Sequence, residues 1–262
     1  MNTTICTILI CLVVCCVVML IIYAWAYSIK NAGVVDIFWA FNFSLIAILL
    51  YFLADGYAQR KMLICAMVLI WSLRLGIYLL VRVGSHLGEE EGRYKKMREE
   101  WGTAANKKLF FFFQAQALSN IYLAIPFFLI AFNPKEGLSP LEYAGAIIWA
   151  ISICGEAIAD AQLKNFKKNP ANKGKVCAAG LWNYSRHPNY FFESMIWVGY
   201  GLVALNASYG WLGLLSPVTI ILLLFRVTGI PLTEQQAIRS KGDAYKEYQR
   251  TTFVFVPWFK KK

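Results

Sequence analysis

Four polar side chains stand at the start of one apolar segment. Arg186, His187, Asn189 and Glu193 lie in the stretch RHPNYFFE, at the mouth of a run apolar enough to be a membrane helix. Asn189 and Glu193 are four residues apart, so on a helix their side chains project from the same face. An amide and a carboxylate in that arrangement suit a carboxamide or a sugar hydroxyl. The stretch therefore predicts a polar binding site at the end of a span.

A second polar pair lies near the end of the preceding apolar run. Glu156 and Asp160 are one helical turn apart, and Leu163 and Lys167 continue the same stripe. Two carboxylates at this spacing repel each other unless cations or hydroxyls face them. With Lys164 they can form a solvated helix end; alternatively, they hold the amide or ribose hydroxyls of a cofactor.

Two ionisable residues lie deeper in apolar segments, where such residues are costly and indicate function. Asp36 can either favour the start of its helix through the helix dipole or face an active cavity. Arg74 shares a helix face with Tyr78 and Arg82, and it is too deep to reach the interface easily. It therefore needs an anionic partner, either a carboxylate such as Asp36 or a ligand phosphate.

The composition decides the class of fold. Of 262 residues, 58% are hydrophobic and 16% are charged, which is too apolar for a soluble domain. A membrane helix needs about 20 apolar residues. The sequence predicts one all-α domain over 1–262, a polytopic seven-transmembrane-helix bundle. The predicted spans are 5–27, 33–54, 62–83, 110–132, 140–163, 190–207 and 209–227. We expect the polar loops 84–109, 164–189 and 228–262 to close a cofactor pocket. The first span lacks a basic leader and a cleavage site, so we expect it to be retained.

Lysine and arginine predict the orientation. If the chain has seven spans, 20 lysine and arginine residues lie on one side of the membrane and three on the other. The excess marks the cytosolic side, so we expect a multi-pass integral membrane protein with its N-terminus outside and its C-terminus and cofactor site in the cytosol. The net charge of +11 belongs to this face. Topology and anionic lipid explain it, or a polyanionic ligand such as a dinucleotide does.

Several kinds of site are not expected. The seven cysteines have no metal-ligand spacing, and with two histidines, His86 and His187, a histidine-rich metal site cannot be built. No glycine-rich nucleotide motif occurs, so helices and loops would hold any nucleotide. We expect membrane lipid and a lipid-like substrate as partners, with no nucleic acid and no obligate protein partner.

Four stretches resemble a known family. They are VVDIFWAF, WSLRLGIYLLVR with EEEGRY after it, GLWNYSRHPNYFFE, and YKEYQRTTFVFVPWF. Together they resemble the short bacterial-type members of the membrane steroid 5α-reductases (3-oxo-5α-steroid 4-dehydrogenases). The Arg-His-Pro portion also resembles isoprenylcysteine carboxyl methyltransferases, and sterol C14 and C7 reductases share Arg, Asn and Tyr there.

The resemblance implies a bundle that binds NADPH from the cytosol and reduces the C4–C5 double bond of a 3-oxo-Δ4 steroid or a similar enone lipid. Asp160, Leu163 and Lys167 match an Asp-x-x-Leu-x-x-x-Arg pattern, with Lys in place of Arg. Asn189 and Glu193 match Asn-x-x-x-Glu, and Arg74 and Tyr78 match Arg-x-x-x-Tyr. His187 contacts phosphate or is structural. The predicted cofactor-binding residues are Arg74, Arg93, Tyr94, Glu156, Asp160, Leu163, Lys167, Lys175, Arg186, His187, Asn189, Glu193, Tyr245 and Tyr248.

The catalytic residues depart from the family. Where the animal enzymes have a Gln-Glu pair and a tyrosine near the steroid ketone, this chain has Asp36 and Trp71. Trp71 donates a hydrogen bond but no proton, whereas Asp36 can deliver a proton if an apolar cavity keeps it protonated. We predict Asp36, Trp71 and Tyr78 as the catalytic group. The alternatives are an S-adenosylmethionine-dependent methyltransferase acting on isoprenylcysteine or lipid, and a non-enzymatic sterol- or lipid-binding membrane protein.

Overall fold

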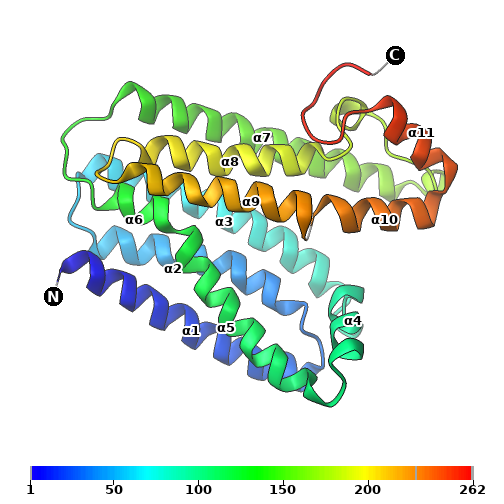
Figure 1. Cartoon of the computed structure of the whole chain (residues 1–262), viewed down its shortest axis with the longest axis horizontal. Coiled ribbons are helices and arrows are strands. Elements are labelled where there is room, and N and C mark those ends of the chain that lie inside the picture. The colour runs from blue at the N-terminus through cyan, green and yellow to red at the C-terminus, as the bar shows by residue number, and fades with distance from the viewer. Residues whose placement is uncertain (1, 228, 261–262) are drawn as a thin grey trace. The chain divides into compact units, whose positions relative to one another are not determined.

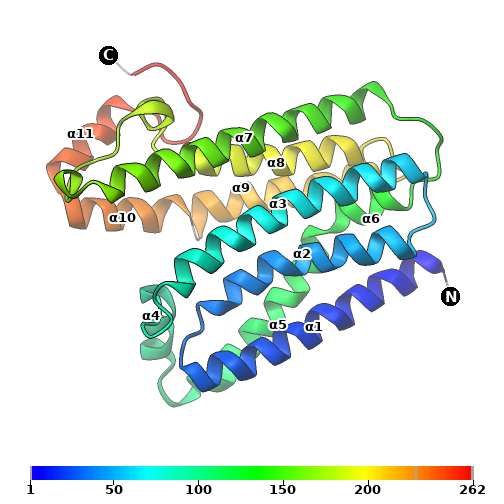
Figure 2. The same cartoon turned by 180° about the vertical axis from the view of Figure 1, so that it is seen from behind.

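The protein is helical throughout the part that its computed structural model describes, residues 2–227 and 229–260. Figure 1 and Figure 2 show its helices from opposite sides. The chain forms two compact units, Met1–Ser139 with Asn206–Leu212, and Pro140–Leu205 with Gly213–Lys262. Each unit is described by itself.

The first unit contains six α-helices within its described residues. They are α1 (Thr3–Ile29), α2 (Val34–Leu53), α3 (Ala58–Gly84), α4 (Gly92–Trp101), α5 (Ala105–Leu123) and α6 (Ile125–Ala131), with a 3-10 turn at Gly102–Ala104. Helix α2 packs against both α1 and α3, as Figure 2 shows. The Ser72 hydroxyl donates to the Ala40 carbonyl oxygen at 2.7 Å, and the Asn42 amide donates to the Asn120 side chain at 3.0 Å. Such bonds hold helices together where the surroundings are apolar.

The predicted span 110–132 is broken into two helices, which form either one bent span or a re-entrant loop. Helices α5 and α6 are bent by 41° at Ala124. The cause is Pro126, at the start of α6. Proline has no backbone N–H and its ring clashes with the preceding turn, so a helix ends or kinks there.

The second unit is built around α7 (Pro140–Lys168) and α8 (Pro188–Ala204), which run antiparallel in Figure 1. A Cβ atom on Gly145 would lie 2.8 Å from the Gly199 carbonyl oxygen, and the reverse distance is also 2.8 Å. Paired glycines allow this close approach. The unit continues with Pro170–Asn172, Gly180–Asn183, α9 (Leu215–Arg226), α10 (Ile230–Lys241) and α11 (Asp243–Thr251), and Gly210–Leu214 joins the two units.

The helices fit a multi-pass membrane protein. Five segments of the described chain are long and apolar enough to cross a membrane: α1, α2, α3, α7 and Gly210–Lys241. The count is six if α5 with α6 is one span. Helix α8, where the sixth span was predicted, has 17 residues, the lower limit of a spanning length. The predicted seven spans are therefore not confirmed, and the orientation stays a prediction.

Candidate functional site

The strongest candidate site lies where α7 faces α8 in the second unit. Asp160 on α7 and Asn189 on the first turn of α8 meet, with the Asn189 Nδ2 atom 3.4 Å from Asp160 Oδ1. Glu156 lies one turn before Asp160 and is buried. The structure thus brings together two pieces that were predicted to act on one ligand.

The other end of the Asn189 amide has no partner. Its Oδ1 atom is shielded from solvent and accepts no hydrogen bond from any described residue. A buried acceptor left unsatisfied costs about 1–3 kcal/mol. Since Asp160 occupies the amide nitrogen, the oxygen is the atom that can accept a donor from a ligand.

Glu193 is held by a residue that the sequence analysis missed. The Trp197 indole N–H donates to Glu193 Oε1 at 2.9 Å, and the Trp197 ring contacts buried Tyr200 at 5.7 Å between centroids. Tyr200 also lies 6.5 Å from Trp149 on α7. Glu193, Trp197 and Tyr200 follow one another at four- and three-residue spacing, so this helical stripe was the available signal.

The Arg-His-Pro motif forms a buried corner with the C-terminal helices. The Arg186 Nε atom donates to Glu234 Oε1 at 2.7 Å, and its Nη1 atom donates to the carbonyl oxygens of Gln249 and Thr252 at 3.0 and 2.6 Å. Arg186 is 9% exposed. It was predicted to bind cofactor phosphate, and the structure shows it joining α10 to the end of α11.

The Glu234 carboxylate forms hydrogen bonds with the side chains of Arg186, His187 and Gln249 at this corner. No sequence motif indicated this residue. Its Oε1 atom lies 3.2 Å from His187 Nε2, and its Oε2 atom accepts from Gln249 Nε2 at 2.7 Å. The His187 ring stacks on Tyr190 at 5.4 Å. Of the two roles left open for His187, these contacts support a structural one, and Pro188 begins α8 directly after it.

Tyr245 and Tyr248, both predicted cofactor contacts, are buried on α11. The Tyr248 hydroxyl donates to the carbonyl oxygens of Trp182 and Ser185. Burial raises the pKa of both phenols, so both are neutral and serve as hydrogen-bond donors at physiological pH. Burial also raises the pKa of the Cys177 thiol, which lies in the loop between α7 and α8.

The remaining predicted residues of this unit lie toward the end of α7 and beyond it. Leu163 is partly exposed, and Lys167 and Lys175 are exposed. Exposed lysines are free to reach a polyanion, but they are equally the expected residues of a solvated surface.

The predicted residues of the first unit form a separate group. Asp36 lies in the first turn of α2, and its Oδ1 atom accepts from the Tyr94 hydroxyl at 2.8 Å. The Arg93 guanidinium lies 5.4 Å from the Tyr94 ring centroid. Helix α2 has no side-chain cap, so Asp36 acts there as a partner of Tyr94 and by its place near the helix N-terminus.

Helix α3 carries the other three predicted residues. Trp71 is fully buried and lies 5.2 Å from the Phe43 ring. Arg74 is partly buried, and Tyr78 is exposed. Trp71 and Tyr78 are seven residues apart and thus project from the same side of α3.

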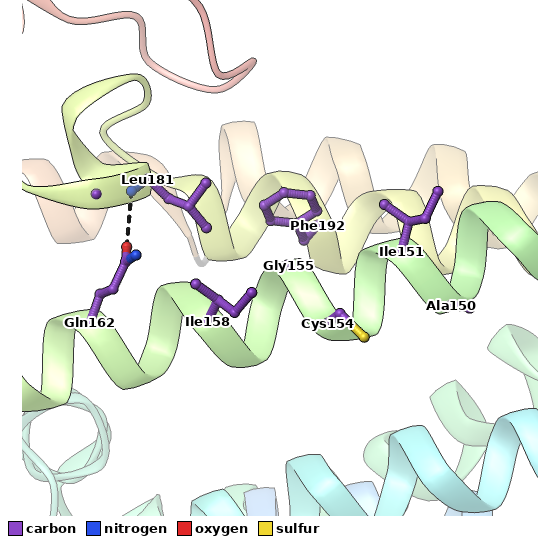
Figure 3. Close-up of a pocket in the computed structure, with 9 residues that line it drawn as sticks. Ala150, Ile151, Cys154, Gly155, Ile158, Gln162, Leu181 and Phe192 are labelled. Atoms are coloured by element: carbon purple, nitrogen blue, oxygen red, sulfur yellow. Dashed lines mark hydrogen bonds between the residues drawn. The ribbon is translucent and has the colours of Figure 1, made fainter.

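An apolar groove of about 720 Å³ lies on another face of the α7–α8 pair (Figure 3). Ile151, Cys154 and Ile158 line it from α7, and Phe192 from α8. Gln162 closes one end, where its side chain accepts from the Leu181 backbone N–H at 2.9 Å. No predicted site residue lines this groove, so the groove is distinct from the polar site. Among residues 2–227 and 229–260, no three His, Cys, Asp or Glu side chains are grouped as a metal ion would require.

Fold and site together define a multi-pass helical membrane protein with a polar site between two helices. The profile of a family described as a protein of unknown function, DUF1295, matches residues 22–252. The chain belongs to this family, which consists of membrane proteins related to the steroid 5α-reductases.

Two curated relatives differ in what their names say. A probable O-methyltransferase of Ustilaginoidea virens is 38% identical over 72 residues, which cover 28% of this chain and 25% of that protein. The match therefore spans about a quarter of the methyltransferase. An uncharacterized protein of Schizosaccharomyces pombe is 25% identical over 271 aligned residues, covering 89% of this chain and 75% of the relative. No solved structure matches the chain.

Proposed function

We propose that this protein is an NADPH-dependent oxidoreductase that reduces the carbon-carbon double bond of an enone lipid, such as the C4–C5 bond of a 3-oxo-Δ4 steroid. The observation that carries the proposal is the buried, unpartnered Oδ1 atom of Asn189 beside Asp160. The chain that carries this site belongs to a family of steroid 5α-reductase-like membrane proteins.

The donor and acceptor pattern of the site fits a nicotinamide nucleotide. Asn189 Oδ1, Asp160, Glu193 and Glu156 present acceptors, whereas a nicotinamide carboxamide and ribose hydroxyls present donors. A ligand N–H placed on Asn189 Oδ1 would recover the cost of the unsatisfied oxygen. These four residues would hold the nicotinamide and its ribose. Lys167 and Lys175 of the same unit would supply positive charge for the phosphates.

When bound, NADPH supplies a hydride for the β-carbon of the enone. The residues of the chain would orient the reacting groups and stabilise the negative charge that develops on the ketone oxygen. Solvent or a tyrosine would then supply the proton that the α-carbon takes up. Asp36, Trp71 and Tyr78 are the proposed donors toward that oxygen. Tyr94 hydrogen-bonds Asp36 and therefore fixes the direction of its carboxyl group.

The test combines binding and turnover. Protein purified in mild detergent is titrated with NADPH while its thermal unfolding is followed, and is then incubated with NADPH and a panel of 3-oxo-Δ4 steroids and other enones. We expect NADPH to raise the unfolding midpoint and at least one enone to be reduced. Asn189→Ala should weaken NADPH binding tenfold or more, about 1.4 kcal/mol, while Asn165→Ala, on an exposed position of α7, should not.

A methyltransferase is the second candidate, because of the 38% identical segment shared with a probable O-methyltransferase. The same acceptor-rich site would then take the amino and ribose groups of S-adenosylmethionine. Stabilisation by S-adenosylmethionine but not by NADPH would overturn the reductase proposal. Stabilisation by neither, with no turnover of any enone, would favour a non-enzymatic lipid-binding protein.

A further inference from the structure

The C-terminal segment 253–260 is bound along the residues that precede α8. The Arg186 backbone N–H donates to the Phe253 carbonyl oxygen at 2.9 Å, within a parallel bridge between Ser185 and Phe253. The Ser185 hydroxyl donates to the Phe255 carbonyl oxygen at 2.7 Å, and the Trp258 N–H donates to the Tyr184 carbonyl oxygen at 3.0 Å. The segment is therefore fixed to the backbone of the Arg-His-Pro corner.

The side chains of this segment point in two directions. The Phe255 ring contacts the protein, 4.8 Å from Phe225 and 5.6 Å from Phe191. Trp258 and Phe259 are instead 61% and 74% exposed, and Phe259 lies 6.3 Å from the exposed ring of Tyr184. We call Tyr184, Val256, Trp258 and Phe259 the aromatic patch. Apolar side chains gathered at a surface mark a contact site for a partner or a membrane.

The charges beside the aromatic patch are positive. Lys260 follows Phe259 directly, and the sequence continues with Lys261 and Lys262. Arg226 is exposed and follows Phe225, whose ring contacts Phe255. From 253 to 262 the sequence has no acidic residue. Aromatic residues next to lysines are the composition that segments at a lipid headgroup interface share.

We propose that the aromatic patch binds the headgroup region of anionic phospholipid, with Trp258 and Phe259 inserted and the cations on lipid phosphates. The proposal is independent of the reaction that the protein catalyses. Because the same segment bonds Ser185 and Arg186, anionic lipid would also stabilise the corner from which α8 starts. Lipid composition would thereby act on the residues that precede Asn189.

The test uses the full chain in nanodiscs of phosphatidylcholine that contain either brominated phosphatidylcholine or brominated phosphatidylglycerol. Bromine quenches tryptophan on contact, and the difference between wild type and Trp258→Phe isolates Trp258. Each Lys or Arg near an anionic membrane surface strengthens binding by about fivefold. Brominated phosphatidylglycerol should therefore quench Trp258 at a several-fold lower content than brominated phosphatidylcholine does. Raising the salt concentration should reduce this preference.

Trp211 is the matched control. It is 62% exposed, and the sequence from 187 to 225 contains no Lys or Arg. The difference between wild type and Trp211→Phe should therefore respond equally to the two brominated lipids. Replacing Lys260, Lys261 and Lys262 by Gln should remove the preference of Trp258 for phosphatidylglycerol while leaving it within reach of lipid.

Three results would overturn the proposal. One is equal quenching of Trp258 by both lipids in the wild-type protein. Another is a preference that survives the lysine replacement and high salt. The third is a Trp258 that neither lipid quenches, which would mean that the aromatic patch does not contact lipid.

Discussion

Replacing Glu234 by Gln tests whether the buried corner holds the second unit together. Glu234 is the acidic partner of Arg186, and it is 15% exposed at its side chain. Removing one member of a buried ion pair costs about 3–5 kcal/mol, because the other charge stays buried. In the mutant, Arg186 keeps its hydrogen bonds to the carbonyl oxygens of Gln249 and Thr252. We therefore expect a loss of stability at the lower end of this range, about 3 kcal/mol.

The expected readout is the unfolding midpoint in mild detergent. For a chain of this length each kcal/mol shifts the midpoint by about 2–4 °C, so Glu234→Gln should lower it by about 6–12 °C. The control is Glu247→Gln. Glu247 pairs with Arg250 through two bonds of 2.8 and 2.9 Å, but its side chain is 58% exposed. An exposed pair of this kind contributes little, so its loss should leave the midpoint nearly unchanged.

A double mutant completes the test. Arg186→Met, Glu234→Leu and the double mutant of both form a double-mutant cycle. The double mutant removes both charges, so it should be less destabilised than the sum of the two single mutants. If Glu234→Gln and Glu247→Gln shift the midpoint equally, or if the two corner mutations add without interaction, the buried ion pair does not hold the corner together.

Three more predictions concern the second unit. Gly199→Leu should lower the unfolding midpoint by several degrees, because its Cβ would lie 2.8 Å from the Gly145 carbonyl oxygen; an unchanged midpoint would show that the helices do not approach so closely. Tyr248→Phe should destabilise the protein by about 1–3 kcal/mol in a denaturant titration, since it leaves two buried carbonyl oxygens without their donor. Cys177 should react with a maleimide more slowly than a model thiol near pH 8, because burial raises the pKa of its thiol and leaves less thiolate at that pH. The reaction should become faster as the pH rises further. Labelling of Cys177 at the rate of the model thiol, in a Cys154→Ser background, would contradict this.

Much of the fold follows from hydropathy, because a bilayer requires long apolar helices. Helices α1, α2, α3 and α7 lie within a few residues of their predicted spans. The break within 110–132 has a local cause in Pro126, which the sequence contains but which a hydropathy average does not reveal. The predicted sixth span, 190–207, is not confirmed because α8 is short and begins at the polar corner.

The site was predictable where polar residues interrupt apolar helices. Asp160 and Asn189 stood out as polar residues in apolar surroundings, and the structure brings them together. Arg186 was predicted to supply positive charge for the phosphates of a bound NADPH. Its partner Glu234 is 48 residues away in the chain, and that pairing depends on how α10 and α11 return to α8.

That separation also fixes the order in which the protein can be made. Arg186 leaves the ribosome long before Glu234, Gln249, Thr252 and Phe253, which lie 48 to 67 residues later and supply its bonds. During synthesis the guanidinium therefore has to remain hydrated or find a temporary acceptor until these residues have been made. The corner closes only after the following helices are complete, so the residues leading into α8 reach their final positions late in biogenesis.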